Sequence, residues 1–305
     1  MTIDVPVVDA HHHLAKLQLG YPWLAPNAPT DRYHGDDRAL RRDYLIEQYR
    51  ADTSDLPLVA SVHIENGAAD SRVEARWIGE VIDAHGPIPA VHVARVDLGT
   101  ADAAQALDEF AEMPHVRGVR HILNWHANAR FTHTPRPGIM LEPSWRQNFA
   151  RLAPCGLSFD LQVFPEQLED ATRLAAEYPE TNIILDHLGM PLARDTDYLH
   201  TWQSRLRALA NHHNVTVKIS AIGTTDHHWT TSSIRPLVLT AIDEFAPNRV
   251  MFGSNFPVDG MYSTLSALYR SFGTITAGFN REERAAMFGQ TAARVYRIKV
   301  PSPDH

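Results

Sequence analysis

The sequence contains little of what secreted, membrane-spanning or disulfide-stabilised proteins depend on. Its 305 residues include a single cysteine, Cys155, so no internal disulfide can form. No apolar run approaches the roughly 20 residues that a transmembrane helix needs. The N-terminus also has no basic stretch followed by a long apolar segment, as a signal peptide would. We therefore expect a cytoplasmic protein that does not act at a membrane.

Basic residues are also too few and too scattered for a polyanion partner. The chain has 28 Lys and Arg against 36 Asp and Glu, which gives a formal net charge of −8, and the basic residues form no block. Nucleic acids are bound through clustered cations, so we expect no nucleic-acid partner. The sequence contains no internal repeat and no Gly/Ser-rich linker. This favours a single domain over residues 1–305.

Eight apolar runs of strand length recur along the chain, and most are followed by a longer stretch with helical spacing. Their content is rich in β-branched residues and nearly continuous, which is typical of parallel strands covered on both faces. The alternation predicts an α/β fold, a (β/α)8 TIM-type barrel, with an open doubly wound sheet as the alternative. The predicted strands are 5–10, 58–64, 88–96, 116–123, 157–163, 182–185, 215–219 and 249–253.

Two long irregular stretches interrupt this pattern, at residues 17–42 and 124–141. Both are rich in proline, asparagine, histidine and aromatic residues. Long loops within a compact domain commonly serve function. We expect both to lie at the rim of the barrel and to help decide what it binds.

Histidine is unusually frequent, with 18 residues. His11 and His13 come at the end of the first predicted strand, where a period of two places them on one face and His12 on the other. At the carboxyl end of a barrel strand, such a pair is suited to binding Zn²⁺. The alternative is a solvated histidine-rich turn. His187, after the sixth strand, is a candidate third ligand, or else a histidine buried for packing alone.

Charged and amide side chains occupy predicted strands that packing alone would fill with apolar residues. Arg120 needs a partner if it is buried. A substrate carboxylate or lactone oxygen would fit its guanidinium fork, and an ion pair with Glu65 or Asp160 is the alternative. Glu65 and Gln162 are candidate substrate-binding residues on neighbouring strands.

Further candidates for substrate binding lie in and after the seventh strand. Lys218 is one, unless it extends to the far end of the barrel or pairs with Asp186. The loop after this strand contains Asp226, His228 and Trp229, a combination suited to a sugar-sized or lactone-sized ligand. An exposed surface turn would have a similar sequence.

Four motifs, in order along almost the whole chain, resemble those of the amidohydrolase superfamily. They are DAHHH at 9–13, DHLGMP at 186–191, VKIS at 217–220 and MFGSNFPVD at 251–259. The closest resemblance is to a lactonase branch that includes sugar-lactone hydrolases and 2-pyrone-4,6-dicarboxylate lactonase. It implies a (β/α)8 barrel with the site at the strand ends and His11, His13 and His187 as the family's histidines. It also implies a divalent metal, zinc before others, which is dispensable in this branch.

One position departs from the superfamily pattern. Asn255 stands where most members have an aspartate that binds metal and takes a proton from water. An amide is a poor metal ligand beside a carboxylate and is not a base near neutral pH. Either three histidines hold the metal, or the metal is dispensable. Asn255 would then position substrate or water. Asp259 is the candidate base, with capping of the next helix as its alternative role.

These observations predict a hydrolase that opens a lactone of a sugar acid or dicarboxylic acid. Activated water would attack the carbonyl carbon at the barrel mouth, and Arg120 or a metal ion would stabilise the oxyanion. One alternative is a metal-dependent nonoxidative decarboxylase of the same superfamily. The other is a barrel that binds a small acid without turnover. In each case the partner is a small lactone or carboxylate.

Overall fold

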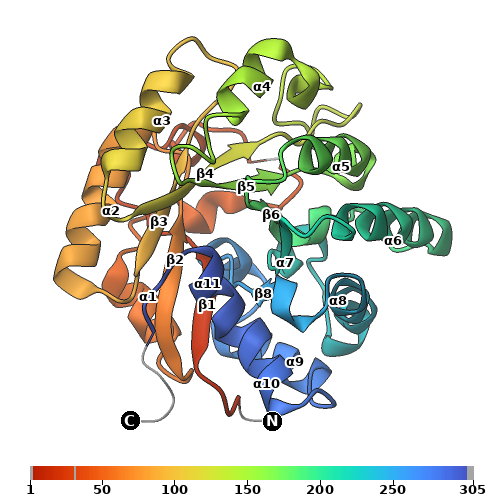
Figure 1. Cartoon of the computed structure of the whole chain (residues 1–305). Helices are drawn as coiled ribbons and strands as arrows, with labels where there is room; N and C mark the ends of the chain where they lie inside the picture. Colours follow the sequence, from red (N-terminus) through yellow and green to blue (C-terminus); the bar gives the residue numbers. More distant parts are fainter. Residues whose placement is uncertain (1–2, 31, 301–305) are drawn as a thin grey trace.

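The computed structural model describes residues 3–30 and 32–300 and contains an eight-stranded parallel sheet (Figure 1). Neighbouring strands are hydrogen-bonded in chain order, from the first to the eighth. A doubly wound sheet would reverse its strand order at one point, so the (β/α)8 prediction is confirmed. The strands are β1 (Val7–His12), β2 (Leu58–Ile64), β3 (Val91–Arg95), β4 (Val116–Ile122), β5 (Ser158–Gln162), β6 (Ile183–Leu185), β7 (Val215–Ile219) and β8 (Val250–Phe252).

Helices surround the sheet on its outer side (Figure 1). In α2, for example, Ala75, Ile78 and Ile82 are buried, because residues three and four apart share one face of a helix. The Asp70 side chain starts this helix by accepting hydrogen bonds from backbone N–H groups. The α-helices are α1 (Ile46–Asp52), α2 (Ser71–His85), α3 (Ala103–Glu112), α4 (Pro143–Phe149), α5 (Leu168–Glu177), α6 (Thr196–Ala210), α7 (Ile222–Thr225), α8 (Thr231–Phe245), α9 (Leu265–Ile275), α10 (Arg281–Ala285) and α11 (Thr291–Val295).

No helix in the described ranges has the length and apolarity that a membrane span requires.

Strands β2 and β7 have the predicted bounds, and the bounds of the other six differ from the prediction by one to three residues. Strand β1 lies two residues later than predicted, because its pairing with β2 continues as far as His12 and His63. The last helical region is not one helix: a π-helical segment, Ala286–Gln290, separates α10 from α11. Gly289 of this segment lies against β1, so close that an added Cβ would be 2.9 Å from the Pro6 carbonyl oxygen. The π-helical segment thus lies where the chain packs tightly against the start of the barrel.

The two predicted rim loops meet each other in space. Residues 17–42 contain short 3₁₀ turns rather than regular helix. The Arg130 guanidinium donates to the Arg32 carbonyl at 3.2 Å. The rings of Tyr33 and His133 also lie with their centres 5.5 Å apart. One loop follows β1 and the other follows β4, so contacts between them join the two sides of the barrel mouth.

The barrel closes between β1 and the chain immediately after β8. The His13 N–H donates to the Phe256 carbonyl, and the Asn255 N–H donates to the His11 carbonyl, both at 2.7 Å. The buried Asp9 carboxylate joins the same seam by accepting from the Ser254 N–H at 2.7 Å and from the Ser254 hydroxyl at 2.6 Å. The seam thus brings the DAHHH and MFGSNFPVD motifs into direct contact.

Gly253 is required by this close approach, so we predict that Gly253→Ala destabilises the fold. A Cβ at this position would lie 2.6 Å from the Cβ of His11 and 3.0 Å from its backbone nitrogen. We expect the free energy of unfolding in urea to fall by about 1–3 kcal/mol. Gly278→Ala is the matched control, because a Cβ there meets nothing within 4 Å. Equal stability of the two variants would contradict the prediction.

Candidate active site

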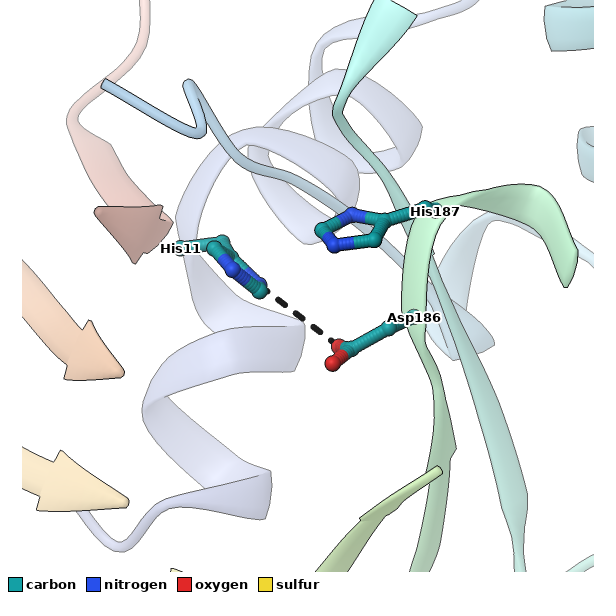
Figure 2. Close-up of side chains that lie close together, drawn as sticks. All are labelled: His11, Asp186 and His187. Atoms are coloured by element: carbon teal, nitrogen blue, oxygen red, sulfur yellow. Dashed lines mark ion pairs between the residues drawn. The ribbon is translucent and has the colours of Figure 1, made fainter. Parts of the chain in front are cut away.

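A cluster of two imidazoles and one carboxylate occupies the barrel centre. His11 comes from β1, and Asp186 and His187 come from the 3₁₀ turn that directly follows β6. Figure 2 shows the three side chains directed toward one another. Their candidate ligand atoms all lie within 4.8 Å of one another. His187 adopts the left-handed region with φ of 59°, which turns the chain abruptly after β6 and leaves both side chains in the barrel.

The donor set of this cluster fits a divalent metal such as zinc. His11 Nε2 and both Asp186 oxygens are buried and have no hydrogen-bond partner among the described residues. The Ser220 hydroxyl lies 2.8 Å from His187 Nδ1, which leaves Nε2 of that ring for a ligand. Two imidazoles, one carboxylate and an open position are typical of catalytic zinc sites. His11, Asp186 and His187 are thus the residues that would hold the ion.

Protonation states in this cluster also suit ligation. Burial lowers the pKa of His11 well below its ordinary value and that of His187 to about 3, so both rings are neutral at pH 7. Burial by itself would raise the pKa of Asp186. The neighbouring Lys218 ammonium and the His11 ring outweigh burial and hold this pKa well below its ordinary value.

His13 lies beside this cluster but has other partners. As predicted, it shares the inner face with His11, with ring centres 5.0 Å apart, while His12 stacks on Tyr49 outside the barrel. Its Nδ1 is 2.9 Å from the Ile64 carbonyl, and its Nε2 is 3.3 Å from the Asn255 side-chain oxygen. The predicted ligand set of His11, His13 and His187 therefore differs from the close cluster, which contains Asp186 instead of His13.

Asp186 is not among the ligands predicted from the sequence, because it stands one residue before the predicted histidine. Side chains of adjacent residues point to opposite faces of a regular strand. Here the backbone leaves the strand conformation at this point, so Asp186 and His187 converge. The DHLGMP motif is the only signal in the sequence that pointed to this pair.

Asn255 is held in one orientation by Asp259. Its amide nitrogen donates to Asp259 Oδ1 at 3.0 Å, which leaves the amide oxygen directed at His13. Asp259 is buried and also accepts from the Gly223 N–H at 2.9 Å and from the Thr224 hydroxyl at 3.0 Å. Burial raises its pKa to about 6 despite these hydrogen bonds. Asp259 thus lies behind Asn255 and does not line the cavity described next.

A cavity of about 220 Å³ opens above His13, His187 and Asn255. Side chains of both rim loops contribute to its walls, so both loops help to shape the cavity. The lining residues are His13, Trp23, Arg32, Tyr33, His34, Glu65, Asn66, Gly67, Arg95, Arg120, Ile122, His133, Gln162, His187, Met190, Ala221, Thr224, Asn255 and Val258.

The buried Arg120 is paired with Glu65, one of the two partners predicted from the sequence. Its Nε is 2.8 Å from Glu65 Oε1, and its Nη1 is 3.3 Å from Gln162 Oε1. Burial opposes ionisation of Glu65, but Arg120 and Arg95 lower its pKa below the ordinary value. Arg120, Glu65 and Gln162 all line the cavity, so the three can contact a ligand.

Four predicted substrate-binding residues do not line the cavity. Lys218 is fully buried below it, with its ammonium 3.2 Å from Asp186 Oδ1. Asp226 accepts from the backbone N–H of the exposed His228 at 3.2 Å, and Trp229 packs against the hydrophobic core. The loop after β7 turns away at this point, so only its first part, which includes Thr224, reaches the cavity.

Several cavity residues were absent from the sequence prediction. Tyr33 and His133 belong to irregular loops, whose side-chain directions follow no period. Arg95 ends β3 and had a readable signal, because it is a charge at the carboxyl end of a barrel strand.

Imidazoles and a carboxylate are gathered at the carboxyl ends of parallel barrel strands. This arrangement is typical of metal-binding enzymes with a barrel fold. The chain belongs to the amidohydrolase family, which it matches over residues 8–298. This confirms the resemblance inferred from the four motifs and places the chain in a family of enzymes.

Three similar proteins illustrate the relationship. The protein y4mH of Sinorhizobium fredii is 37% identical over 298 residues, which cover 97% of this chain and 99% of that protein. An L-fucono-1,5-lactonase of Burkholderia multivorans is 27% identical over 310 residues, covering 97% of each chain. A crystal structure of an amidohydrolase from Burkholderia multivorans with bound zinc has a TM-score of 0.80 and 25% identity. That match covers 97% of this chain and 100% of the other.

Buried histidines determine how the stability of the protein depends on pH. Burial is the main cause that lowers the pKa to about 4 for His13, His34, His92 and His121. The unfolded chain keeps a histidine pKa near 6.5. Between pH 6.5 and 4 these histidines therefore bind more protons in the unfolded state than in the folded state, and their contribution to stability falls as the pH falls.

We predict that His92→Gln weakens this dependence. His92 Nδ1 is 3.0 Å from His63 Nδ1, and a glutamine oxygen can accept the same N–H. Each such histidine contributes a slope of about 1.4 kcal/mol per pH unit within its window, so the variant should lose about that much slope. The measurement is urea unfolding at pH values from 6.5 to 4. His200→Gln, on the exposed face of α6, should keep the wild-type slope, and equal slopes for all three proteins would refute the prediction.

Proposed function

We propose that the protein is a hydrolase that opens a lactone in the cavity above His13 and Asn255. The observation that carries the proposal is the approach of His13 Nε2 to the Asn255 side-chain oxygen at the cavity wall, from which we infer a pair of hydrogen-bond acceptors. His13 Nε2 and the Asn255 oxygen lie 3.3 Å apart, and neither has a proton to offer the other. The similarity to L-fucono-1,5-lactonases supports the same chemistry.

His13 and Asn255 are left as hydrogen-bond acceptors because each has a second partner on the side away from the other. A carbonyl has no proton, so His13 Nδ1 must donate to the Ile64 carbonyl, which leaves a lone pair on Nε2. The Asn255 amide nitrogen is directed at Asp259, which leaves the amide oxygen toward His13. A water molecule that donates one proton to each acceptor would have its own lone pair directed toward a substrate.

In this proposal His13 is the general base. Because its pKa is about 4, the ring is neutral and able to accept a proton at pH 7. As the water oxygen bonds to the lactone carbonyl carbon, a water proton moves to His13 Nε2 and the carbonyl oxygen becomes an oxyanion. The Arg120 guanidinium stabilises that charge, and Glu65 keeps the guanidinium in place. The oxyanion then re-forms the carbonyl as the ring C–O bond breaks, His13 passes its proton to the departing ring oxygen, and the product is a hydroxy acid.

The metal site adds to this chemistry without replacing it. When bound by His11, Asp186 and His187, a divalent ion supplies Lewis-acid polarisation of a carbonyl oxygen. Asp259 acts as a positioning residue, because its oxygens are occupied by the donors that surround it.

The charges of the cavity favour a lactone that carries a carboxylate. Arg32, Arg95 and Arg120 line it, against the single carboxylate of Glu65. Arg120 donates a hydrogen bond to Glu65, whereas Arg95 Nε has no hydrogen-bond partner among the described residues and forms only a longer ion pair with Glu65, at 3.9 Å. A guanidinium fork matches a carboxylate in two parallel hydrogen bonds. Acidic lactones should therefore bind more tightly than neutral sugar lactones of the same ring size.

The first experiment measures acid release from a panel of acidic and neutral lactones at constant pH. We expect turnover, with the highest kcat/KM for acidic lactones, and a loss of at least about 100-fold in kcat for His13→Gln. His200→Gln is the control for a histidine far from the cavity and should keep wild-type rates. Release of CO₂ from aromatic carboxylates without lactone opening would replace the proposal by a decarboxylase. Binding without any turnover would refute an enzymatic role for the cavity.

A second experiment separates His13 from Asp259 as the base. With His13 as the base, kcat/KM should fall at acid pH with a midpoint near the pKa of His13, about 4. Asp259→Asn should lower kcat by about 10- to 100-fold through misplacement of Asn255 and leave that midpoint unchanged. A midpoint near 6, the pKa of Asp259, that disappears in Asp259→Asn would assign the base to Asp259 instead.

A further inference from the structure

Lys218 places an ammonium group against the cluster of His11, Asp186 and His187. Its side chain is fully buried, and its ammonium forms ion pairs with Asp160 and with Asp186, the latter at 3.2 Å. The same nitrogen lies 3.4 Å from His11 Nδ1. Two of its three polar contacts are therefore with residues that would hold a divalent ion.

The ammonium and a divalent ion need the same groups. The ammonium lies 3.2 Å from Asp186 Oδ1 in an ion pair, and its charge opposes the approach of a second cation to the same oxygen. The effect on His11 is less direct. If Lys218 donates to Nδ1, the single proton of the neutral ring must be on Nε2, and that nitrogen has no lone pair for a metal. If Nδ1 instead carries the proton and faces Asp186, 3.6 Å away, Nε2 is available. Lys218 thus favours the ring form that does not bind metal.

The charges at the barrel centre support the same conclusion. Asp160 and Asp186 are both buried, and Lys218 is the cation that contacts both. Without the ammonium, two carboxylates would face two neutral imidazoles, an arrangement with high affinity for a divalent cation. With it, the carboxylates are already partly neutralised before any ion arrives.

We propose that Lys218 acts as an internal competitor of the divalent ion for Asp186 and His11, so that the site keeps its geometry and binds metal only weakly. This role is independent of which substrate the cavity accepts. The competing interpretation is that Lys218 serves only to neutralise Asp160, in which case its removal would leave metal affinity unchanged.

The test is the affinity for Zn²⁺, measured by calorimetric titration of chelator-treated, full-length protein. Lys218→Met leaves both carboxylates without their cation, which endangers folding. The decisive variant is therefore Lys218→Met combined with Asp160→Asn. In this double variant, the amide oxygen introduced at position 160 can still accept a hydrogen bond from the Tyr296 hydroxyl, which in the wild type donates to Asp160 Oδ1 at 2.7 Å. We expect one Zn²⁺ to bind about 10- to 100-fold more tightly than to the wild type, the range typical of changes next to metal ligands.

Three controls make the outcome specific. Lys16→Met, in a loop outside the cavity, should leave Zn²⁺ affinity unchanged. Asp160→Asn alone keeps the ammonium and should not tighten binding; a gain equal to that of the double variant would assign the effect to Asp160 and overturn the proposal. Adding Asp186→Asn to the double variant should abolish the gain. Wild-type affinity in a double variant whose circular dichroism and thermal unfolding show a folded protein would also overturn it.

Discussion

Closure of the barrel between β1 and β8 is the constraint on which the site depends. The Asp9 carboxylate bridges the seam by accepting hydrogen bonds from Ser254 and from the Tyr49 hydroxyl, the latter at 2.8 Å. Burial raises the pKa of Asp9, so these donors compensate for placing a carboxylate in the interior. Because the strands meet here at van der Waals distance, residue 253 has no room for a Cβ unless its neighbours shift. His13 and Asn255, 242 residues apart in sequence, become neighbours as a consequence.

The interior above this seam is unusually polar, and each buried charge has a specific partner. Arg120 pairs with Glu65, and Lys218 pairs with Asp160 and Asp186. Buried ion pairs add little net stability, but loss of one partner is costly because it leaves an isolated charge. Such pairs therefore hold their members in one arrangement. In this barrel they keep a guanidinium at the cavity wall and an ammonium against the cluster of His11, Asp186 and His187.

Regular elements and irregular loops differed in how far the sequence could predict them. Strands 58–64 and 215–219 were predicted with their observed bounds, because apolar runs report directly on burial. The loops at 17–42 and 124–141 were expected at the rim. Which of their side chains line the cavity could not be predicted, since Tyr33 and His133 are placed by contacts between the two loops. Those contacts have no counterpart in local sequence.

The sequence by itself determined the barrel, the family and the strand ends on which the chemistry rests, because hydrophobic period and short motifs act locally. Only the tertiary structure decided how the polar residues pair. It gathered Asp186 with His11 and His187 in one close cluster, put Asp259 behind Asn255 and placed the Lys218 ammonium against Asp186. The physical reason is that a side chain's partner depends on strand register and on the left-handed turn at His187. These bring together groups that the chain separates by up to about 250 residues.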